Sequence, residues 1–293
     1  MTTTPGRAAP PSAPRDGAGA RPTRTLAVCA DDFGLTPGIS AGIAGLAHAQ
    51  RLTAVACIAN SPHWGESARL LQGLPDTVDV GLHLNLTEGR PLSARLARRW
   101  PRLPGLARLI ALAHLGLLPR SAVRREVHAQ LAAFSDAFGR PPRFIDGHQH
   151  VHQLPGLRRI ILDMVEHVQP LPALRSTARV LGPGFGVKRW LIAHTGGRAL
   201  ERELAQRVIA RNPALLGAYD FAAPNYQALM RGWLAALPAG GGLLFCHPGA
   251  RQAGDAPDPI HAARARELAY LGSVAFDADL AAAKVRLGRV WTT

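Results

Sequence analysis

Two adjacent carboxylates end the first apolar run of the chain. In "LAVCADDFGLTPGI" (residues 26–39), Asp31 and Asp32 follow a short stretch that is typical of a buried strand. Neighbouring ionised carboxylates repel each other, so the pair needs a cation, a shared proton or open water. Capping a helix is the simplest structural role for an aspartate. Here, however, Thr36 followed by Pro37 already provides an N-cap and a first helical residue. The pair therefore points to chemistry.

Histidines follow other apolar runs. "VDVGLHLNLTEG" places His83 and Asn85 at the end of one run, and "LLFCHPG" places His247 at the end of another. A single histidine at a strand end is more often a hydrogen-bonded structural residue, and His247 before Pro-Gly is equally consistent with a turn. Their common location at the ends of predicted strands is the stronger signal, because parallel α/β folds carry catalytic groups where strands end.

A third group of polar residues lies in "FIDGHQHVHQLP", where Asp146 is followed by His148, His150 and His152. On a strand, a period of two would place the three imidazoles on one face. Such a cluster packs poorly in a core and suits metal binding, whereas a solvated His-rich loop is the alternative. One aspartate and two histidines from separate strands would form a metal site with open positions for water and substrate.

The pattern along the chain predicts how these strand ends meet. Short apolar runs, typical of strands, alternate with longer helical patterns. The predicted strands are residues 25–30, 53–59, 78–84, 143–146, 173–176, 217–221 and 242–246, and the predicted helices are residues 39–50, 122–138, 157–168, 200–211, 226–237 and 261–271. Continuous apolar strands separated by helices indicate parallel pairing. About seven such units favour closure into a TIM-like (β/α) barrel, with a doubly wound open sheet as the alternative.

Composition limits the classes of partner and compartment. The net charge of +14 comes almost wholly from arginine, which is scattered along all 293 residues without a nucleic-acid-binding module. We therefore expect no nucleic-acid partner. The three cysteines, Cys29, Cys57 and Cys246, form no C-x-x-C pair, which predicts a reducing, cytoplasmic location.

The domain prediction is a disordered tail over residues 1–24 and a single barrel domain over residues 25–293. The tail is rich in Pro, Gly, Ala and Arg and lacks the apolar core of a secretory signal. Residues 90–120 form an insertion rich in Arg, Leu and Pro. Its apolar stretch from residue 105 to 119 is too short to cross a bilayer and predicts an amphipathic or core helix. Peripheral contact with a membrane through this helix stays open.

The chain resembles the YdjC-like family of carbohydrate deacetylases, which includes chitooligosaccharide deacetylases of the ChbG type and the HpnK deacetylases of hopanoid biosynthesis. The resemblance rests on "ADDFGLTPGI", "GLHLNLTEG", "FIDGHQHVHQLP" and "CHPG", in that order, and covers the chain from residue 25 almost to its end. It implies a distorted TIM-like barrel and metal-dependent removal of acetyl groups from N-acetylated sugars. The insertion and the tail have no counterpart in these motifs.

The resemblance also implies roles for single residues. One divalent cation, Zn²⁺ or Mg²⁺, would be held by Asp32, His83 and His148. Asp31 would be the catalytic base, and His247 would lie at the site. Because the leaving amine needs a proton, we assign the role of acid to His247. We assign contacts with the sugar or with the metal ligands to the remaining polar residues of the motifs, His150, His152 and Asn85.

Three other functions fit parts of the pattern. An amidohydrolase also uses His-x-His, although typically on its first strand. A metal-dependent phosphoesterase could use similar ligands but normally holds two ions. A catalytically silent barrel could bind a sugar or a protein partner, yet binding alone would not need Asp31 as a base.

Overall fold

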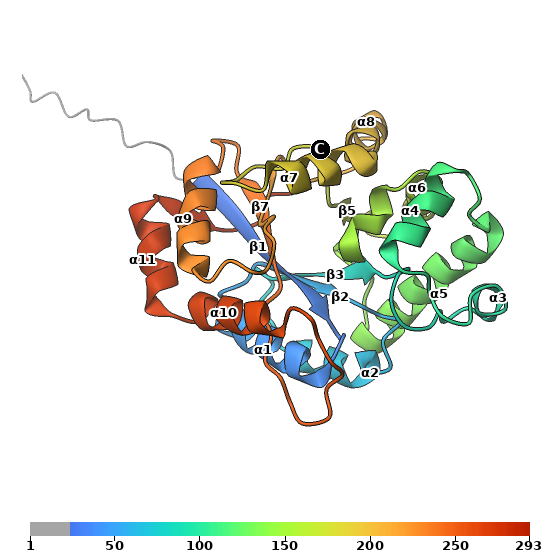
Figure 1. Cartoon of the computed structure of the whole chain (residues 1–293), viewed down its shortest axis with the longest axis horizontal. Coiled ribbons are helices and arrows are strands. Elements are labelled where there is room, and N and C mark those ends of the chain that lie inside the picture. Colours follow the sequence, from blue (N-terminus) through green and yellow to red (C-terminus); the bar gives the residue numbers. More distant parts are fainter. Residues whose placement is uncertain (1–23) are drawn as a thin grey trace, which may run out of the picture.

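A single curled sheet of parallel strands forms the centre of the molecule (Figure 1). The computed structural model describes residues 24–293. The strands run in the order β5-β4-β3-β2-β1-β7-β6, and β8 pairs with the start of β1. Their bounds are β1 (Arg24–Phe33), β2 (Ala54–Cys57), β3 (Asp79–Leu84), β4 (Phe144–Gly147), β5 (Ala173–Leu174), β6 (Leu215–Leu216), β7 (Gly242–Cys246) and β8 (Val285–Leu287).

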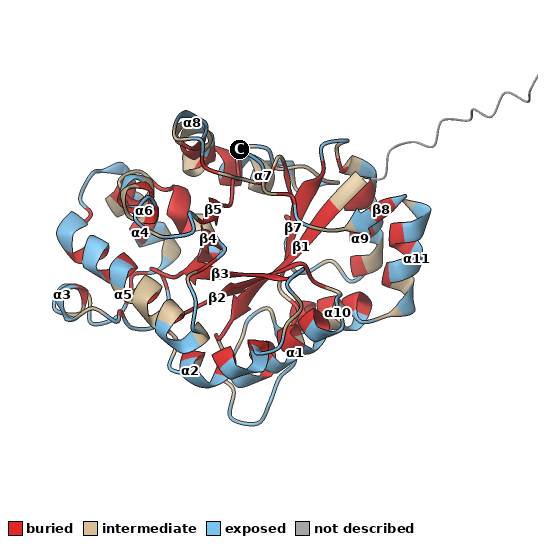
Figure 2. Ribbon diagram, turned by 180° about the vertical axis from the view of Figure 1, so that it is seen from behind, coloured by how far each residue is buried: buried red, intermediate tan, exposed pale blue. Residues whose placement is uncertain are grey.

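Helices surround the sheet and turn their apolar sides towards it (Figure 2). They are α1 (Pro37–His48), α2 (Trp64–Ser67), α3 (Ala94–Ala97), α4 (Leu106–His114), α5 (Arg120–Phe138), α6 (Leu157–Val165), α7 (Gly186–Ile192), α8 (Arg198–Gln206), α9 (Tyr226–Ala236), α10 (His261–Leu271) and α11 (Val274–Ala282). Short helical turns add η1 (Ala68–Leu71), η2 (His148–Gln153) and η3 (Ala193–Gly197).

The first strand, β1, is the central element of the sheet. It pairs with β2 and β8 along one edge and with β7 along the other, and residues 26–33 are all buried. A parallel strand covered on both faces has no solvent side, which explains the unbroken apolar run before Asp31. The sheet ladders around β1 therefore fix where the two aspartates emerge.

The sheet curls until β5 and β6 approach each other across a narrow gap. Single parallel bridges, Leu174 with Arg211 and Val180 with Leu215, span this gap in place of a continuous ladder. The predicted parallel α/β architecture, a TIM-like barrel of about seven strands, is confirmed.

Two strands differ from the sequence prediction. The sixth strand was expected at residues 217–221 but lies at Leu215–Leu216. The strand ends there because Gly217 has a φ of +106°, which is not a strand conformation, and packs closely against the backbone carbonyl of Phe245. The short strand β8 was not predicted. Of its three residues, Val285 is buried, Arg286 is exposed and Leu287 is partly buried, so they give no apolar run.

The helix signals read from the sequence are confirmed where they were strongest. The side chain of Thr36 accepts a hydrogen bond from the backbone N–H of Ile39, and Pro37 is the first residue of α1. Within the insertion, α4 is amphipathic and buries Leu109 and Ala113.

Among residues 24–293, no helix combines the length and the apolar character needed to cross a bilayer. The predicted tail lies outside the described residues except for Arg24, which begins β1.

Gly217 provides a test of how β6 ends. A Cβ there would lie 2.1 Å from the carbonyl oxygen of Phe245, and its φ is unfavourable for other residues. We expect Gly217→Ala to lower the free energy of unfolding by about 1–3 kcal/mol. Gly240→Ala, where a Cβ meets nothing within 4 Å, is the control and should change stability little. Urea denaturation measures both, and equal effects would contradict this account of the strand end.

Candidate active site

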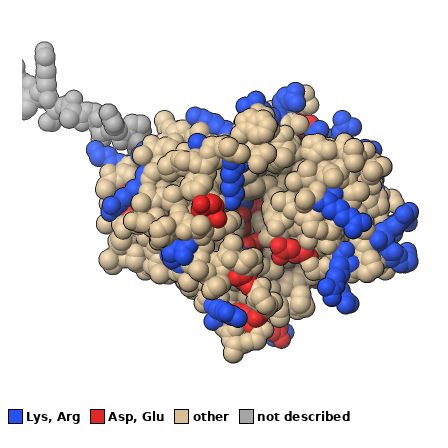
Figure 3. Space-filling view, in the orientation of Figure 1, with Lys and Arg blue, Asp and Glu red and all other residues tan. Residues whose placement is uncertain are grey.

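A cavity of about 460 Å³ opens at the carboxyl ends of the strands. Acidic side chains gather in the hollow seen on the face of the molecule in Figure 3, whereas basic side chains lie mostly around it. Polar side chains from β1, β3, η2 and α10, and from the loops after β3, after β7 and before α10, line the cavity. They are Asp31, Asp32, His83, Glu88, His148, Gln149, His150, His247, Asp258 and Arg264. Apolar residues such as Leu35, Leu106, Ile192, Phe221 and Phe245 form the remaining walls.

The two aspartates point to different partners because the backbone of β1 is irregular there. The pairing of β1 with β2 shifts register between Ala30 and Phe33, and Asp32 has a φ of +69°. Asp31 accepts two hydrogen bonds from the guanidinium of Arg175, Nη1 to Oδ2 at 2.7 Å and Nη2 to Oδ1 at 2.6 Å. Oδ2 of Asp32 accepts one from Nη2 of Arg264 at 2.7 Å. Each buried carboxylate thus has its own buried cation.

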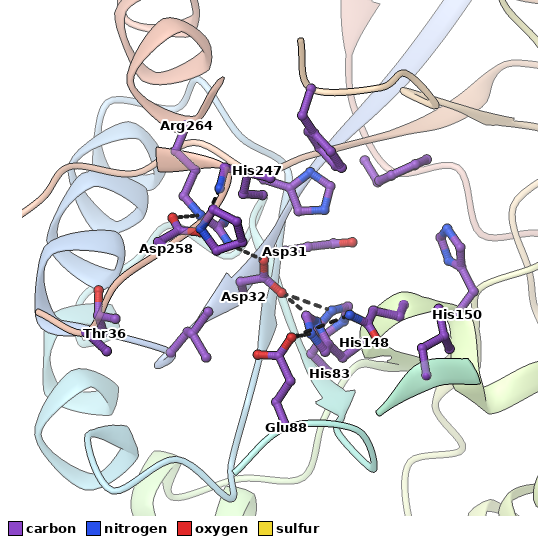
Figure 4. A pocket seen from close by; sticks show the side chains of 18 of the residues that line it. Asp31, Asp32, Thr36, His83, Glu88, His148, His150, His247, Asp258 and Arg264 are labelled. Atoms are coloured by element: carbon purple, nitrogen blue, oxygen red, sulfur yellow. Dashed lines mark hydrogen bonds and ion pairs between the residues drawn. The ribbon is translucent and has the colours of Figure 1, made fainter. Parts of the chain in front are cut away.

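Asp32, His83 and His148 bring one ligand atom each within 4.8 Å of one another, and all three residues are buried (Figure 4). Oδ1 of Asp32 lies 2.8 Å from Nδ1 of His148 and 3.5 Å from Nε2 of His83. The other nitrogen of His83 lies 2.6 Å from Oδ1 of Asp146, a carboxylate–histidine pairing that orients metal-binding imidazoles. This donor set fits a divalent cation.

The electrostatics of the three groups are those of a site built around positive charge. Burial would raise the pKa of Asp32, but Arg264 and His148 hold it well below its usual range. Burial alone would lower the pKa of both histidines. Instead the carboxylates of Asp146 and Asp31 raise the pKa of His83 to about 10, and Asp32 raises that of His148 to about 9. The described side chains therefore favour a cationic occupant, a proton or a metal, at this position.

The three motif histidines do not share a strand face as the period of two suggested. β4 ends at Gly147, and residues 148–153 form η2, in which Gln149 and His150 have positive φ. His148 consequently reaches Asp32 and His150 lines the cavity against Phe245. His152 turns away, where its Nε2 lies 2.9 Å from the backbone carbonyl of Arg175.

Asn85 is buried beneath the cavity and is not among its lining residues. Its Oδ1 accepts hydrogen bonds from the backbone N–H groups of Thr87 and Glu88, and its Nδ2 donates to the carbonyl of Glu88. Asn85 thereby shapes the turn that brings Glu88 to the cavity, where Oε1 lies 3.2 Å from Nε2 of His148.

His247 lies on the cavity wall formed by β7 and α10 (Figure 4). Its backbone N–H donates to Oε2 of Glu267 at 2.5 Å, and Tyr219 donates its hydroxyl to the same carboxyl group. Burial lowers the pKa of His247 to about 4 and raises that of Glu267 to about 7. The His247 ring is therefore neutral near pH 7.

Several charged residues at the site, Glu88 and Asp258 of the cavity wall among them, were not found from the sequence. Arg175 and Arg264 are buried partners of the aspartates, and Glu267 holds His247. Arginine is so frequent in this chain that neither position stands out. A signal was present for the pair in α10, since Arg264 and Glu267 occur three residues apart on the face that also buries Ala263 and Leu271.

Together these features define a TIM-like α/β barrel that carries a candidate metal centre at the carboxyl ends of its strands. The chain belongs to the YdjC-like protein family, whose model matches residues 25–282. The resemblance inferred from the four motifs is thus confirmed.

Individual relatives carry names that describe sugar deacetylation. A "Carbohydrate deacetylase" of Homo sapiens is 34% identical over 186 residues, covering 59% of this chain and 54% of the human protein. A "Chitooligosaccharide deacetylase" of Salmonella schwarzengrund is 34% identical over 145 residues, covering 47% of this chain and 54% of that protein. The chain spans about half the length of the curated relatives it matches.

A solved structure shares the whole fold. An Enterococcus faecalis protein, named for a suggested role in cellobiose-phosphate cleavage, superposes with a TM-score of 0.70 at 22% identity. The match covers 92% of this chain and 98% of that chain. At this identity the likeness shows the common architecture.

The donor set predicts which histidines are needed for metal. His83→Ala and His148→Ala should each weaken divalent-metal affinity by at least about a hundredfold, because each removes one imidazole ligand. His150→Ala is the matched control. It removes an imidazole from the same turn as His148 but outside the donor set, and should keep the metal. Elemental analysis and chelator competition measure this, and metal retained in either ligand variant would remove that residue from the set.

Glu267 predicts a pH dependence of stability. Its folded-state pKa of about 7 exceeds that of an ordinary glutamate, so the folded state binds its proton more tightly than the unfolded chain does. Stability should therefore fall as pH rises from about 4.5 to 7, by up to roughly 3 kcal/mol from this group. Glu267→Gln should remove this part of the slope. Urea unfolding across this window tests the prediction, and parallel pH curves for the two proteins would contradict it.

Proposed function

We propose that this protein is a metal-dependent carbohydrate N-deacetylase, a hydrolase of the linear amide in N-acetylated sugars. The observation that carries the proposal is the arrangement of Asp31. Its carboxylate, held by Arg175, lines the same cavity as the donor set of Asp32, His83 and His148. The names of the relatives support sugar deacetylation, and both free chitooligosaccharides and glycolipids such as N-acetylglucosaminyl hopanoids are candidate substrates.

Asp32, His83 and His148 would hold one divalent cation, Zn²⁺ or Mg²⁺, and the two imidazoles favour zinc. When bound, such an ion lowers the pKa of a water molecule and polarises a carbonyl group. Asp31 is the base that takes the proton from the attacking water, and the two hydrogen bonds from Arg175 fix its orientation. Asp146 contacts both Arg175 and His83, and so links the base to the metal ligands.

Amide hydrolysis also needs a proton for the leaving amine, and His247 is the donor that we propose. Because its low pKa leaves the ring neutral near pH 7, His247 must take up this proton during turnover, and the proton that Asp31 removes from the attacking water balances it. Glu267 holds the backbone of His247 in place from the opposite side. His150 faces the cavity as a sugar contact, whereas Asn85 and His152 support the turns that carry Glu88 and His150.

A two-metal phosphoesterase fits these residues less well. A second group of candidate ligands consists of Cys29, Asp31 and Asp146. Nη2 of Arg175 lies within 3.1 Å of the Cys29 sulfur and within 2.6 Å of oxygens of both carboxylates. Its charge takes the place of a second cation there. The cytoplasmic location expected from the cysteines stays a prediction.

Asparagine variants of the two aspartates test the proposal. Asp32→Asn should lose metal and activity together, because an amide is a weaker ligand. Asp31→Asn should keep the metal but lower kcat by about 10²-fold or more, with KM little changed, because only the proton acceptor is lost. The measurements are acetate release from a panel of N-acetylated sugars and glycolipids, and metal content.

Asp136→Asn is the control, because Asp136 is an exposed carboxylate on α5, and it should behave as the unchanged protein. If Asp31→Asn loses the metal and Asp32→Asn keeps it, Asp31 is the ligand and Asp32 is the base. Full activity in both variants would reject the hydrolytic mechanism. Metal binding without acetate release from any substrate would favour a silent binding barrel.

A further inference from the structure

The insertion after β3 is strongly basic. Residues 90–120 contain seven arginines and no Asp or Glu, and each of these arginines is exposed: Arg90, Arg95, Arg98, Arg99, Arg102, Arg108 and Arg120. Nothing in the proposed reaction uses them. Several basic side chains lie on the right of the cavity face in Figure 3, on the side where Figure 1 places α3 and α4.

Large apolar side chains are exposed in the same insertion and on α7. Leu115 and Leu117, in the turn after α4, are 70% and 63% exposed. On α7, Val187, Trp190 and Leu191 are 76%, 57% and 47% exposed. Scattered exposed apolar residues are ordinary on a protein surface, but five of the ten large ones among residues 24–293 fall on two segments that border the cavity.

These two segments belong to one rim of the cavity. α4 packs against η2, η2 packs against η3, and η3 continues α7. Leu106 of α4 and Ile192 of α7 line the cavity. In Figure 1, α7 lies at the top of the view and α4 lies to its right. We call the exposed surface of α4, residues 115–117 and α7 the apolar rim.

We propose that the apolar rim docks on an anionic lipid bilayer, with the arginines of residues 90–120 in contact with lipid headgroups. Aliphatic side chains and a tryptophan flanked by arginines are the composition of surfaces that lie in a membrane interface. An acidic protein would satisfy the charge, but separate protruding side chains offer it no groove. A bilayer accepts such side chains without a matching shape. Docking would place the cavity mouth beside the membrane surface.

The experiment measures binding of the full-length protein to vesicles without any sugar substrate, so its outcome is independent of the proposed reaction. Vesicles of phosphatidylcholine alone and with added phosphatidylglycerol are compared by flotation at low and high salt. We expect binding to the anionic vesicles, weakened by salt. Leu115→Ser/Leu117→Ser and Trp190→Ser/Leu191→Ser should each reduce this binding by about tenfold.

The matched control is Leu70→Ser/Val274→Ser. These side chains are 43% and 83% exposed, and they lie on η1 and α11 instead of on the rim. The control should bind vesicles as the unchanged protein does. Circular dichroism and thermal unfolding establish that all variants are folded.

Three outcomes would overturn the proposal. The first is the absence of binding to either kind of vesicle. The second is equal binding by the rim variants and the control, which would leave general charge attraction as the cause. The third is a dimer, found by light scattering, that only the rim variants dissociate, which would assign the surface to a second copy of the chain.

Discussion

The site depends on the burial of two adjacent carboxylates at the end of the central strand. Asp31 and Asp32 are each 2% exposed, and their charges would repel strongly without compensation. The chain separates them through the positive φ of Asp32 and gives each a buried guanidinium, Arg175 for Asp31 and Arg264 for Asp32. Removing one partner from such a pair typically leaves an uncompensated buried charge and costs several kcal/mol.

The two arginines come from different elements of the barrel. Arg175 follows β5 and Arg264 lies on α10, so the local geometry at the end of β1 depends on distant parts of the chain. Arg264 also donates from Nε to Oδ2 of Asp258, a residue of the cavity wall. The position of Asp32 is therefore linked to the loop that borders the cavity.

Sequence reasoning predicted the parallel barrel and most helices because those features follow local rules. Unbroken apolar runs indicate buried parallel strands, and Thr36-Pro37 is a helix start at any position in a protein. It placed the sixth strand wrongly because the end of β6 is set by contact between Gly217 and Phe245, which a sequence does not display. The pairing of Arg175 and Arg264 with the aspartates, across 144 and 232 residues, was equally hidden.

For the His-rich motif, sequence reasoning grouped His148 with Asp32 and His83 as the structure does, but it expected a strand where residues 148–153 form a helical turn. Positive φ at Gln149 and His150 breaks the strand period, so that His148 reaches Asp32 while His152 reaches the carbonyl of Arg175. Asp31 and Asp32 are also connected through side-chain contacts. The series runs from Asp31 to Arg175, from Arg175 to Asp146, from Asp146 to His83, and from His83 to Asp32. Because Arg175 contacts the proposed base, Asp146 contacts a proposed metal ligand and the two contact each other, a change in either should disturb both proposed roles together. The proposed separation of proton transfer from metal binding is therefore tested most directly at the two aspartates themselves.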